Sequence, residues 1–491
     1  MELPDWVKKY KKAGTAVEVH GNHYYLRRIG SVWDKEKGRA RKVSGEYLGK
    51  ITVDGLIPPK YERVRRSMTG GNVTVREFGA TQFILNCNDD VVGLLKTYYP
   101  SWWKEILVFA IFRLLYNTPL KNVDFYYYTS FISETISDAD VSDRAIEPFI
   151  RMLGAERGII ERFLKHFVIE NECIAVDLTH VFSLSENVIS STLGHNSKNE
   201  FLPQINLFYL FSLDRMMPSY FRVLIGSINS VKSLKLSIKE SGARNVVIVG
   251  DKGFYSANNV NDIEADGLKY VLPLKRDSAL ISYDKIKSGK KESFADFFRF
   301  ENRIVWYYEY KMKVGRRKVI VFIDDKLRAE EEKDLLSRID VQRGKEKEGA
   351  AEELAGFYEN QYKLGTIAVV TNLEEDATKV FEILKSRVDI EQMYDVFKNT
   401  LHADRTYMRD DYQVEGWMFI NFVSLLLYYK IYNMLVDRGL LKKYSPMDVL
   451  ISLSRIHKLK LGDEWVISEI PKKTNQILEK LDPHITKNLR S

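Results

Sequence analysis

The spacing of hydrophobic and polar residues changes several times along the chain. Residues 18–53 alternate short apolar and polar runs between Gly and Asp-Lys breaks, which predicts a small antiparallel sheet. From about residue 88 to residue 168 the spacing becomes helical. Within this region SWWKEILVFAIFRLLY is apolar nearly all round, so we expect that helix to be buried.

Short apolar runs of strand length dominate residues 172–273. The first three, CIAVDLTHVF, QINLFYLFSL and SYFRVLIGSI, have brief connections, as in a meander. A predicted helix, VKSLKLSIKESGA, leads to the fourth run, VVIVGD, and a fifth, YVLPLK, follows another helical stretch. This succession predicts a mixed sheet with a crossover connection.

The strand pattern is interrupted at residues 276–364, where FRFENRIVWYYEYKMKVGRRKVIVFIDD predicts a hairpin or small sheet. It resumes with TIAVVTNL, residues 366–373, and Asp376 then opens a predicted helix over residues 378–400. The apolar stretch 416–435 is interrupted by two asparagines and a lysine. We interpret it as a buried core helix, because a membrane span needs about 20 mostly apolar residues.

These changes of pattern divide the chain into six predicted regions of α/β class. A mixed sheet with helices is interrupted by a mostly β insertion and preceded by a small β unit and a helical region. In chain order we expect a basic β unit at 1–80, a helical region at 81–165, the first part of the core at 166–275, the β-rich insertion at 276–364, the second part of the core at 365–440, and a basic C-terminal tail at 441–491.

The charge is unevenly distributed. The 491 residues are 45% apolar and 29% charged, which favours folded domains over disorder. Residues 1–66 hold 16 Lys or Arg against 8 Asp or Glu, whereas the rest of the chain has a net charge of −1. A basic N-terminal segment favours a polyanion such as nucleic acid as a partner, with a solvated surface as the alternative.

Two features of the sequence bear on the cellular compartment of the protein. The first residues, MELPD, are polar and acidic and show no signal pattern. Two cysteines, Cys87 and Cys173, are too few for a disulfide framework or a cysteine zinc site. We therefore expect a cytoplasmic protein with no membrane partner.

Three acidic residues stand at positions that suit catalysis. Asp177 lies within the first predicted core strand, and Asp251 ends the fourth. Gly250 and Gly253 allow the backbone to turn there and a ligand to approach closely. The carboxyl edge of such a sheet is where α/β sites usually lie. The third acid, Glu391, lies on the predicted helix after the sheet.

The helix that carries Glu391 also carries two cations. At about 100° per residue, Arg387, Glu391 and Lys398 fall within roughly 60° of one another. Three carboxylates converging from two strands and a helix would bind two Mg²⁺ ions about 4 Å apart, which can activate a water or a 3′-hydroxyl for attack on a phosphodiester. Arg387 and Lys398 would hold the DNA phosphates beside them.

Simpler interpretations of the same residues stay open at this point. An Asp after an apolar strand is most often a helix cap or a turn former. KVIVFIDD, which ends at Asp324 and Asp325, has much the same local pattern as the strand before Asp251. A stripe of Arg, Glu and Lys is most often a solvated helix face.

Four segments together resemble the DDE transposases of bacterial insertion sequences. They are IAVDLTHVFS, LGHNSKNEFLPQINLFYLFSLDRMMPSYFRVLIGSINS, GDKGFYS and TNLEEDATKVFEILKSRVDIEQMYDVFKNTL. The last is similar to the family's Tyr-(two)-Arg-(three)-Glu-(six)-Lys signature, and Arg387, Glu391 and Lys398 match its spacing. The resemblance covers residues 166–275 and 365–435, and the N-terminal sheet is also similar to one branch of the family.

The resemblance implies a ribonuclease-H-like core with a β insertion at residues 276–364. It also implies that Asp177, Asp251 and Glu391 hold two Mg²⁺ ions, which Mn²⁺ can replace. The partners it implies are double-stranded DNA, both transposon ends and target, and a second copy of the chain in a homodimer that pairs two ends.

The resemblance suggests roles for two aromatic residues. The signature's Tyr position holds Leu384, so we ask whether Tyr394, three residues beyond Glu391, points the same way. Trp306 lies in the insertion, where some relatives use a tryptophan to stack on a flipped base. Ordinary packing is the alternative for both Tyr394 and Trp306.

The function that this implies is a cut-and-paste transposase. It binds the terminal inverted repeats of its insertion sequence, cleaves each end by metal-dependent hydrolysis, and joins the freed 3′-hydroxyls to target DNA. The alternatives are a hydrolytic metal-dependent nuclease on the same fold and a DNA-binding protein whose catalysis has lapsed.

Overall fold

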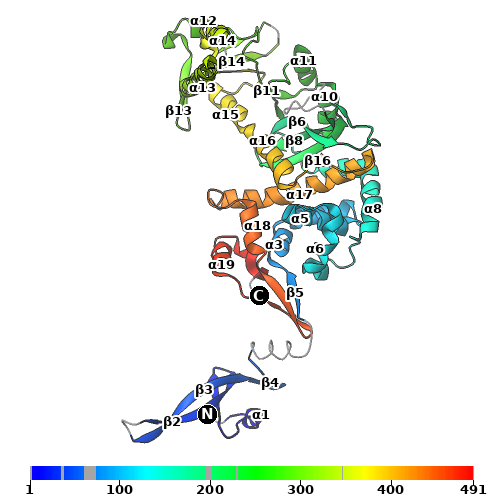
Figure 1. Ribbon diagram of the computed structural model, residues 1–491, viewed down its shortest axis with the longest axis vertical. Coiled ribbons are helices and arrows are strands. Elements are labelled where there is room, and N and C mark those ends of the chain that lie inside the picture. Colours follow the sequence, from blue (N-terminus) through cyan, green and yellow to red (C-terminus); the bar gives the residue numbers. More distant parts are fainter. Residues whose placement is uncertain are drawn as a thin grey trace.

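The computed structural model describes residues 3–34, 38–59, 73–194, 202–227, 231–313, 315–344 and 347–489. Within these ranges the strands form a four-stranded, an eleven-stranded and a three-stranded sheet. The eleven-stranded sheet and its helices lie toward one end of the long axis, and the four-stranded sheet lies at the other (Figure 1).

Five neighbouring strands form the centre of the large sheet. They are β6 (Cys173–Ser183), β8 (Pro203–Ser212), β9 (Met217–Ile225), β10 (Val247–Val249) and β11 (Lys269–Pro273). Their order is β9-β8-β6-β10-β11, in which β6, β8 and β9 are antiparallel neighbours and β10 and β11 run parallel to β6. The predicted mixed sheet with a crossover is therefore confirmed.

Helices cover both faces of this sheet. Every residue of β8 after Pro203 is buried, which explains why its sequence is a continuous apolar run rather than an alternating one. The helices α9 (Arg157–Lys165), α10 (Val231–Ser241) and α17 (Asp411–Asp437) pack on β9. The helix predicted before the fourth core strand is α10.

The insertion extends the core sheet instead of forming a sheet of its own. Beyond β11 the order continues with β15, β14, β13 and β12, all antiparallel. These strands are β12 (Asp296–Phe300), β13 (Arg303–Lys311), β14 (Lys318–Asp324) and β15 (Thr366–Thr371). Val314, within the segment for which we predict a hairpin or small sheet, lies outside the described residues.

The second half of the insertion is helical, which corrects the prediction of a mostly β segment. Two helices, α13 (Asp325–Arg343) and α14 (Lys347–Asn360), pack against each other. Their sequences are rich in Glu, Lys, Arg, Ala and Leu, which are strong helix formers. The charged sequence of these two helices carries no hydrophobic pattern that indicates a strand or a core. The prediction for the whole insertion therefore follows the hairpin pattern that precedes them.

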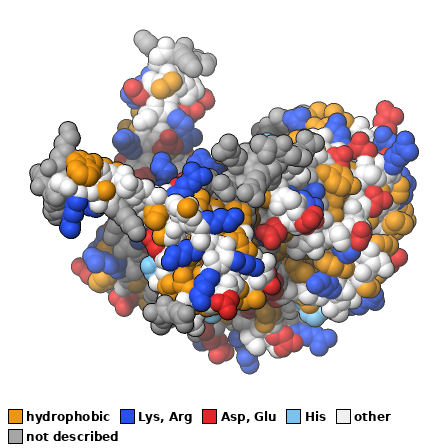
Figure 2. Space-filling model, turned by 90° about the horizontal axis from the view of Figure 1, so that it is seen from below, with side chains coloured by type: hydrophobic (Ala, Val, Ile, Leu, Met, Phe, Trp, Pro, Cys, Tyr) orange, Lys and Arg blue, Asp and Glu red, His pale blue; other side chains and the backbone are white. Residues whose placement is uncertain are grey.

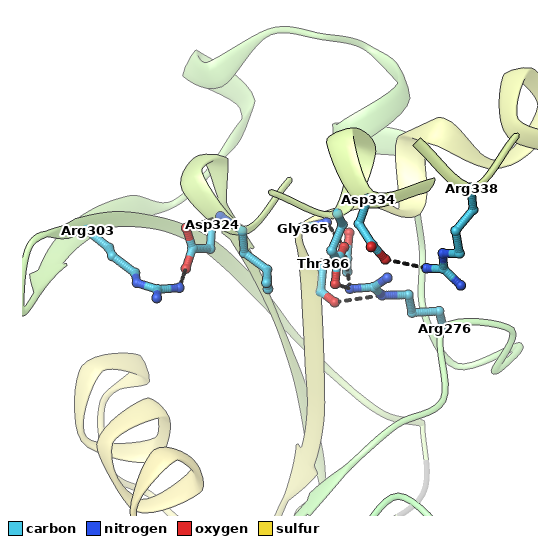
Figure 3. Close-up of polar contacts among 9 residues, drawn as sticks. Arg276, Arg303, Asp324, Asp334, Arg338, Gly365 and Thr366 are labelled. Carbon is cyan, nitrogen blue, oxygen red and sulfur yellow. Dashed lines mark hydrogen bonds and ion pairs between the residues drawn. The ribbon is translucent and has the colours of Figure 1, made fainter. Parts of the chain in front are cut away.

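Polar contacts tie α13 to the core strand β15 (Figure 3). The Arg276 guanidinium donates to the Thr366 carbonyl at 3.1 Å and to the Glu331 carboxylate at 2.7 and 2.9 Å. Glu331 also accepts from the Gly365 backbone N–H at 2.8 Å. The insertion helices are therefore fixed to the strand that leads toward Glu391.

The long helix α17 is the centre of a second, helical layer. By length and composition it could cross a membrane, but 72% of its apolar window is buried inside the protein. It packs on α5 (Trp103–Tyr116) and α8 (Asp143–Ala155). The predictions that 416–435 and SWWKEILVFAIFRLLY are buried helices are confirmed. The other helices of this layer are α3 (Gly79–Cys87), α4 (Asp89–Tyr98), α6 (Val123–Thr129) and α7 (Ile132–Thr135).

The C-terminal segment 441–491 folds back on the helical layer, so the predicted tail is wrong for its described residues. It forms α18 (Pro446–Leu453), β17 (His457–Leu461), β18 (Glu464–Ile467), α19 (Lys472–Leu478) and α20 (Pro483–Thr486). Strand β17 pairs with β18 and with β5 (Thr74–Glu77). Gly462, at φ 65°, occupies the turn between the strand segments LKL and EWVI. A glycine between two such segments is a hairpin signal, which the basic composition of this region obscured.

The N-terminal β unit has a core of its own. Its elements are α1 (Asp5–Lys8), β1 (Thr15–His20), β2 (His23–Asp34), β3 (Arg39–Thr52) and β4 (Gly55–Ile57), with the four strands antiparallel in chain order. Val7, Leu26 and Ile51 are buried between the helix and the sheet. Strand β5 pairs with the C-terminal hairpin instead, so this sheet ends before the predicted boundary at residue 80.

Candidate active site

Asp177 lies in the middle of β6, the central strand of the core. Its neighbour across the ladder is Tyr209 of β8, and its own side chain is 18% exposed. Carboxylate Oδ1 accepts the backbone N–H of Leu178 at 2.8 Å. The strand thus holds one carboxylate oxygen in place and leaves the other, Oδ2, directed toward Arg387.

Asp251 follows β10, which runs parallel to β6 at its side. The backbone turns at once, because the Phe254 N–H donates to the Asp251 carbonyl at 2.9 Å. The carboxylate accepts the Lys252 N–H at 2.6 Å and is about half exposed. A parallel neighbour therefore delivers a second carboxylate to the same region of the sheet as Asp177.

Gly250 is required by close packing rather than by a positive φ. A Cβ at this position would lie 2.9 Å from Leu272 Cδ2 and 3.0 Å from Phe254 Cβ, whereas a Cβ at Gly253 would meet nothing within 4 Å. Neither glycine has a left-handed φ. The predicted close approach is thus made by the protein's own side chains at Gly250, while Gly253 faces open space.

These contacts predict that Gly250→Ala lowers the free energy of unfolding by about 1–3 kcal/mol, the usual cost of overpacking. Urea denaturation measures this loss, and strand cleavage should fall with it because Asp251 shifts. Gly253→Ala is the matched control and should change stability by less than about 0.5 kcal/mol. Equal stabilities of the two variants would contradict the packing argument.

Glu391 lies on a helix that is broken twice, which corrects the predicted continuous helix over 378–400. Helix α15 (Ala377–Ser386), capped by Asp376 as predicted, ends at Arg387. Helix α16 (Val388–Asp395) carries Glu391, and a π turn, Val396–Thr400, follows. The wider turn changes the angular position of every residue after it.

The guanidinium of Arg387 brings the three acids together. Its Nη2 lies 3.4 Å from Asp177 Oδ2 and 3.7 Å from Asp251 Oδ1, and its Nη1 lies 2.7 Å from Glu391 Oε1. Three carboxylates from two strands and a helix thus surround one cation. They lie far apart in the sequence, and only the fold can place them around a single group.

Burial and repulsion between the carboxylates raise the pKa of Asp177, the most enclosed of these acids. The pKa of Asp177 is raised from 3.8 to about 6, mainly by desolvation; Arg387 and the Leu178 N–H lower this pKa, and the nearby charges of Asp251 and Glu391 add to the rise. Because the folded state holds the proton more tightly than the unfolded state, the charged form costs stability. The cost begins above about pH 4 and levels off above about pH 6.

We therefore expect Asp177→Asn to stabilise the metal-free protein at neutral pH by about 1–2 kcal/mol, less than the full shift because Arg387 loses a partner. The gain should shrink as pH falls through 6 and vanish near pH 4. Thermal unfolding in a chelator across this pH range measures it. A gain that is constant with pH would show that the carboxylate is not the cause.

The donor set suits a hard divalent cation. Three carboxylates offer only oxygen ligands, which Mg²⁺ and Mn²⁺ prefer. In the described part of the chain, no three acidic, His or Cys side chains stand in a metal-binding cluster, and the Arg387 guanidinium lies among these three acids. The buried Arg387 Nε has no hydrogen-bond partner there. The residues therefore fit the predicted ions, provided that the Arg387 side chain swings out.

Two of the residues predicted to contact DNA, Lys398 and Tyr394, do not line the hollow beside the three acids. Lys398 stands on the π turn and lines a different hollow, beside Arg405 and Trp417. Tyr394 is 9% exposed, lies 5.9 Å from the ring of Tyr209 and points into the core, where burial raises its pKa well above the usual value. The structure therefore agrees with the packing alternative for Tyr394. The side chain of Tyr394 is not placed to substitute for the signature tyrosine, whose position holds Leu384.

Trp306 packs on a neighbouring aromatic ring, and Asp324 is a buried helix cap. Trp306 is half-buried against Phe297, with ring centroids 4.9 Å apart. The neighbouring position on β12, Phe298, packs instead on Phe381 of α15, so Trp306 lies on the opposite face of the hairpin from that helix. Asp324 is 1% exposed, caps α13 and pairs with Arg303 at 3.2 Å, which removes it as a rival of Asp251 (Figure 3).

Sequence reasoning missed the cations beside the acids. A hollow of about 310 Å³ is lined by Asp251, Arg387 and Glu391 together with Lys252 and Lys385. Burial lowers the pKa of Lys385, with a smaller contribution from Arg303. Lys252 directly follows Asp251 in the sequence, but charge alone does not distinguish such a lysine from a surface one.

Comparison with known proteins shows the family to which the chain belongs. A family model described as "Transposase DDE domain" matches residues 172–427, more than half of the chain and the range that holds all three acids. No curated protein matches. Among solved structures the chain is similar to a piggyBac transposase synaptic complex with hairpin DNA, at 11% identity and a TM-score of 0.40, over 84% of this chain and 81% of that one. On the family match, the chain belongs to the DDE transposases.

Proposed function

We propose that this protein is a transposase of an insertion sequence. It binds the terminal inverted repeats of its element, cleaves the ends by phosphodiester hydrolysis, and joins the 3′-hydroxyl ends to target DNA. The observation that carries the proposal is the convergence of Asp177, Asp251 and Glu391 on Arg387, all within 3.7 Å of its guanidinium nitrogens. It acts in the cytoplasm of a bacterium or archaeon, on nucleoid DNA.

Asp177, Asp251 and Glu391 would hold two Mg²⁺ ions, or Mn²⁺ in their place. When bound, this pair supplies an activated water or 3′-hydroxyl and stabilises the leaving oxygen. Asp177 is fixed by its strand and by the Leu178 N–H, so its position needs no reorganisation. The more exposed Asp251 and Glu391 adjust around it.

Cations of the chain position the DNA strand. Arg387, once displaced from the carboxylates, stays tethered beside them and can pair with a phosphate in the forked geometry that a guanidinium favours. Lys252 and Lys385 line the same hollow and add positive charge near the scissile phosphate. These residues neutralise the substrate, since the three acids alone would repel it.

The strand order of the core supports a ribonuclease-H-like architecture. Three antiparallel strands are followed by two that run parallel to the first, and the acids lie on β6 and directly after β10. The insertion enters between β11 and β15, the place that the family resemblance predicts. The catalytic helix α16 then packs back on β6.

The N-terminal β unit would bind the transposon ends and, with the helices to about residue 165, would read their sequence. Residues 1–66 have an excess of eight positive charges, which is sufficient for several phosphate contacts. Lys and Arg side chains are prominent near the centre of the face seen from the N-terminal end of the long axis (Figure 2). Two copies of the chain would pair two DNA ends in a homodimer.

The DNA flanking the gene provides the test. Imperfect inverted repeats on both sides identify the ends, and purified protein incubated with these ends, a target plasmid and Mg²⁺ should yield joined products. Cleavage without joining would favour the hydrolytic nuclease. Binding without cleavage would favour a lapsed DNA-binding protein, and absence of both would reject the proposal.

A further inference from the structure

A second hollow, outside the catalytic centre, has the chemistry of a nucleotide site. Its volume is about 890 Å³, and it lies between α5, α8, α17 and the π turn that follows Glu391. Residues that are hundreds of positions apart in the sequence enclose it, so it is a product of the packed fold. Nothing in the mechanism above uses it.

The floor of the hollow is apolar. Leu120, Ile146, Ile150 and Trp417 line it and are each at most 7% exposed, so they form a fixed surface. At the rim stands Tyr407, which is 86% exposed. Flat aromatic rings beside an apolar surface are the usual platform for a nucleobase that has left the stack.

The rim and the deeper wall are cationic. Lys121, Lys398 and Arg405 line the hollow with a single acid, Asp404. Arg405 is held in place by the face of Phe182, 5.8 Å from the ring centroid. A phosphate attached to a base in the hollow would therefore meet positive charge.

Arg113 gives an independent reason to expect an anion. It is 4% exposed and lines the hollow, and within the described ranges no carboxylate lies within 4.0 Å of it. Its guanidinium donates only to neutral oxygens, of Asn421, Thr118 and Leu401, and burial lowers its pKa to about 10. A buried cation without a carboxylate partner is costly, and the negative charge of a phosphate at the rim of the hollow would offset part of that cost.

We propose that this hollow holds one unpaired nucleotide of the DNA strand bound at the catalytic centre, with the base between Tyr407 and the apolar floor and its phosphate at the cationic rim. This inference rests on the proposed function, because it requires DNA at the three acids. It assigns the stacking role to the helical layer and not to Trp306.

The fold also limits which nucleotide can reach the hollow. Lys398 lies seven residues after Glu391, or roughly 10 Å along a helix. Arg405 pairs with Phe182, five residues after Asp177 on β6, or roughly 17 Å along the strand. At roughly 3.4 Å per nucleotide, the bound base lies about three to five positions from the cleaved bond.

Binding of a single-stranded oligothymidine of about 16 nucleotides to the full chain in a chelator tests the site without catalysis. Tyr407→Ala should weaken binding in fluorescence anisotropy by about fivefold to a hundredfold, the effect of losing one stacked base. Lys121→Glu should weaken it by about tenfold or more through the rim charge. Tyr358→Ala, at an exposed tyrosine of α14, is the control and should change nothing.

The position is tested with end DNA that carries one photoreactive 5-iodouracil at successive sites. Crosslinks to the peptide containing Tyr407 from about three to five nucleotides beyond the cleaved bond support the proposal. Crosslinks to Trp306, or unchanged oligothymidine binding in both variants, would overturn it while leaving DNA cleavage, and so the proposed function, intact. If wild-type protein binds neither duplex nor single-stranded DNA, both proposals fall.

Discussion

Glu391→Gln and Asp177→Ala should each lower the rate of end cleavage and strand joining by about a thousandfold or more, the equivalent of roughly 4 kcal/mol in the barrier. Each change removes one carboxylate of the set around Arg387, and the two that remain cannot hold a cation pair in the same way. Duplex DNA binding should remain, because the basic N-terminal unit is untouched. Gel-shift and cleavage assays on the same preparations measure the two activities separately.

The chain offers a matched control for the glutamate. Glu330 lies on α13, its side chain is 52% exposed compared with 55% for Glu391, and it also has a cationic neighbour one turn away, Lys326. Glu330→Gln should therefore cleave DNA like the wild type. Cleavage that survives in Asp177→Ala would show that the three acids are not the catalytic set.

The strands and the two aspartates could be predicted from the sequence because their signals are local. Asp177 sits within an apolar run and Asp251 ends one, and strand geometry places both at the same part of a parallel pair. The apolar run of β8 and the apolar circumference of α5 likewise indicated burial directly. In each case a local run of apolar residues was sufficient.

The parts that could not be predicted depend on distant contacts. The break at Arg387 leaves no mark in composition, since the sequence around it favours a helix throughout. The π turn moves Lys398 out of the stripe that ideal helix geometry predicted for it. Strand β5 pairs with β17, nearly four hundred residues away, and no local pattern announces such a partner.

Asp324 and Tyr394 show where local patterns mislead. Asp324 and Asp251 both end an apolar strand, and only the structure separates a buried helix cap paired with Arg303 from a half-exposed carboxylate facing Arg387. Tyr394 has suitable spacing after Glu391, yet its turn of the helix faces the core. The spacing of residues in the sequence indicates which residue types can form a site. The direction in which each side chain points depends on the neighbours that pack around it.

Arg387→Gln should have opposite effects on metal binding and on catalysis. In the metal-free protein the guanidinium occupies the space among the three carboxylates, so a divalent ion must displace it. Without it the carboxylates keep an uncompensated negative charge, and the affinity for Mn²⁺ should rise about three- to tenfold at neutral pH. End cleavage should nevertheless fall about ten- to a hundredfold, because a phosphate ligand is lost.

The pH dependence of Mn²⁺ binding gives this prediction a second measurable consequence. Arg387 lowers the pKa of Asp177, so its removal lets that pKa rise above about 6, and protons then compete with the ion at higher pH. Titration of free Mn²⁺ by electron paramagnetic resonance at two pH values measures both effects. Arg303→Gln, which removes the partner of Asp324 instead, is the control and should leave Mn²⁺ affinity unchanged. If Arg387→Gln lowers metal affinity together with cleavage, then the arginine shapes the carboxylate site and does not occupy the place of the ion.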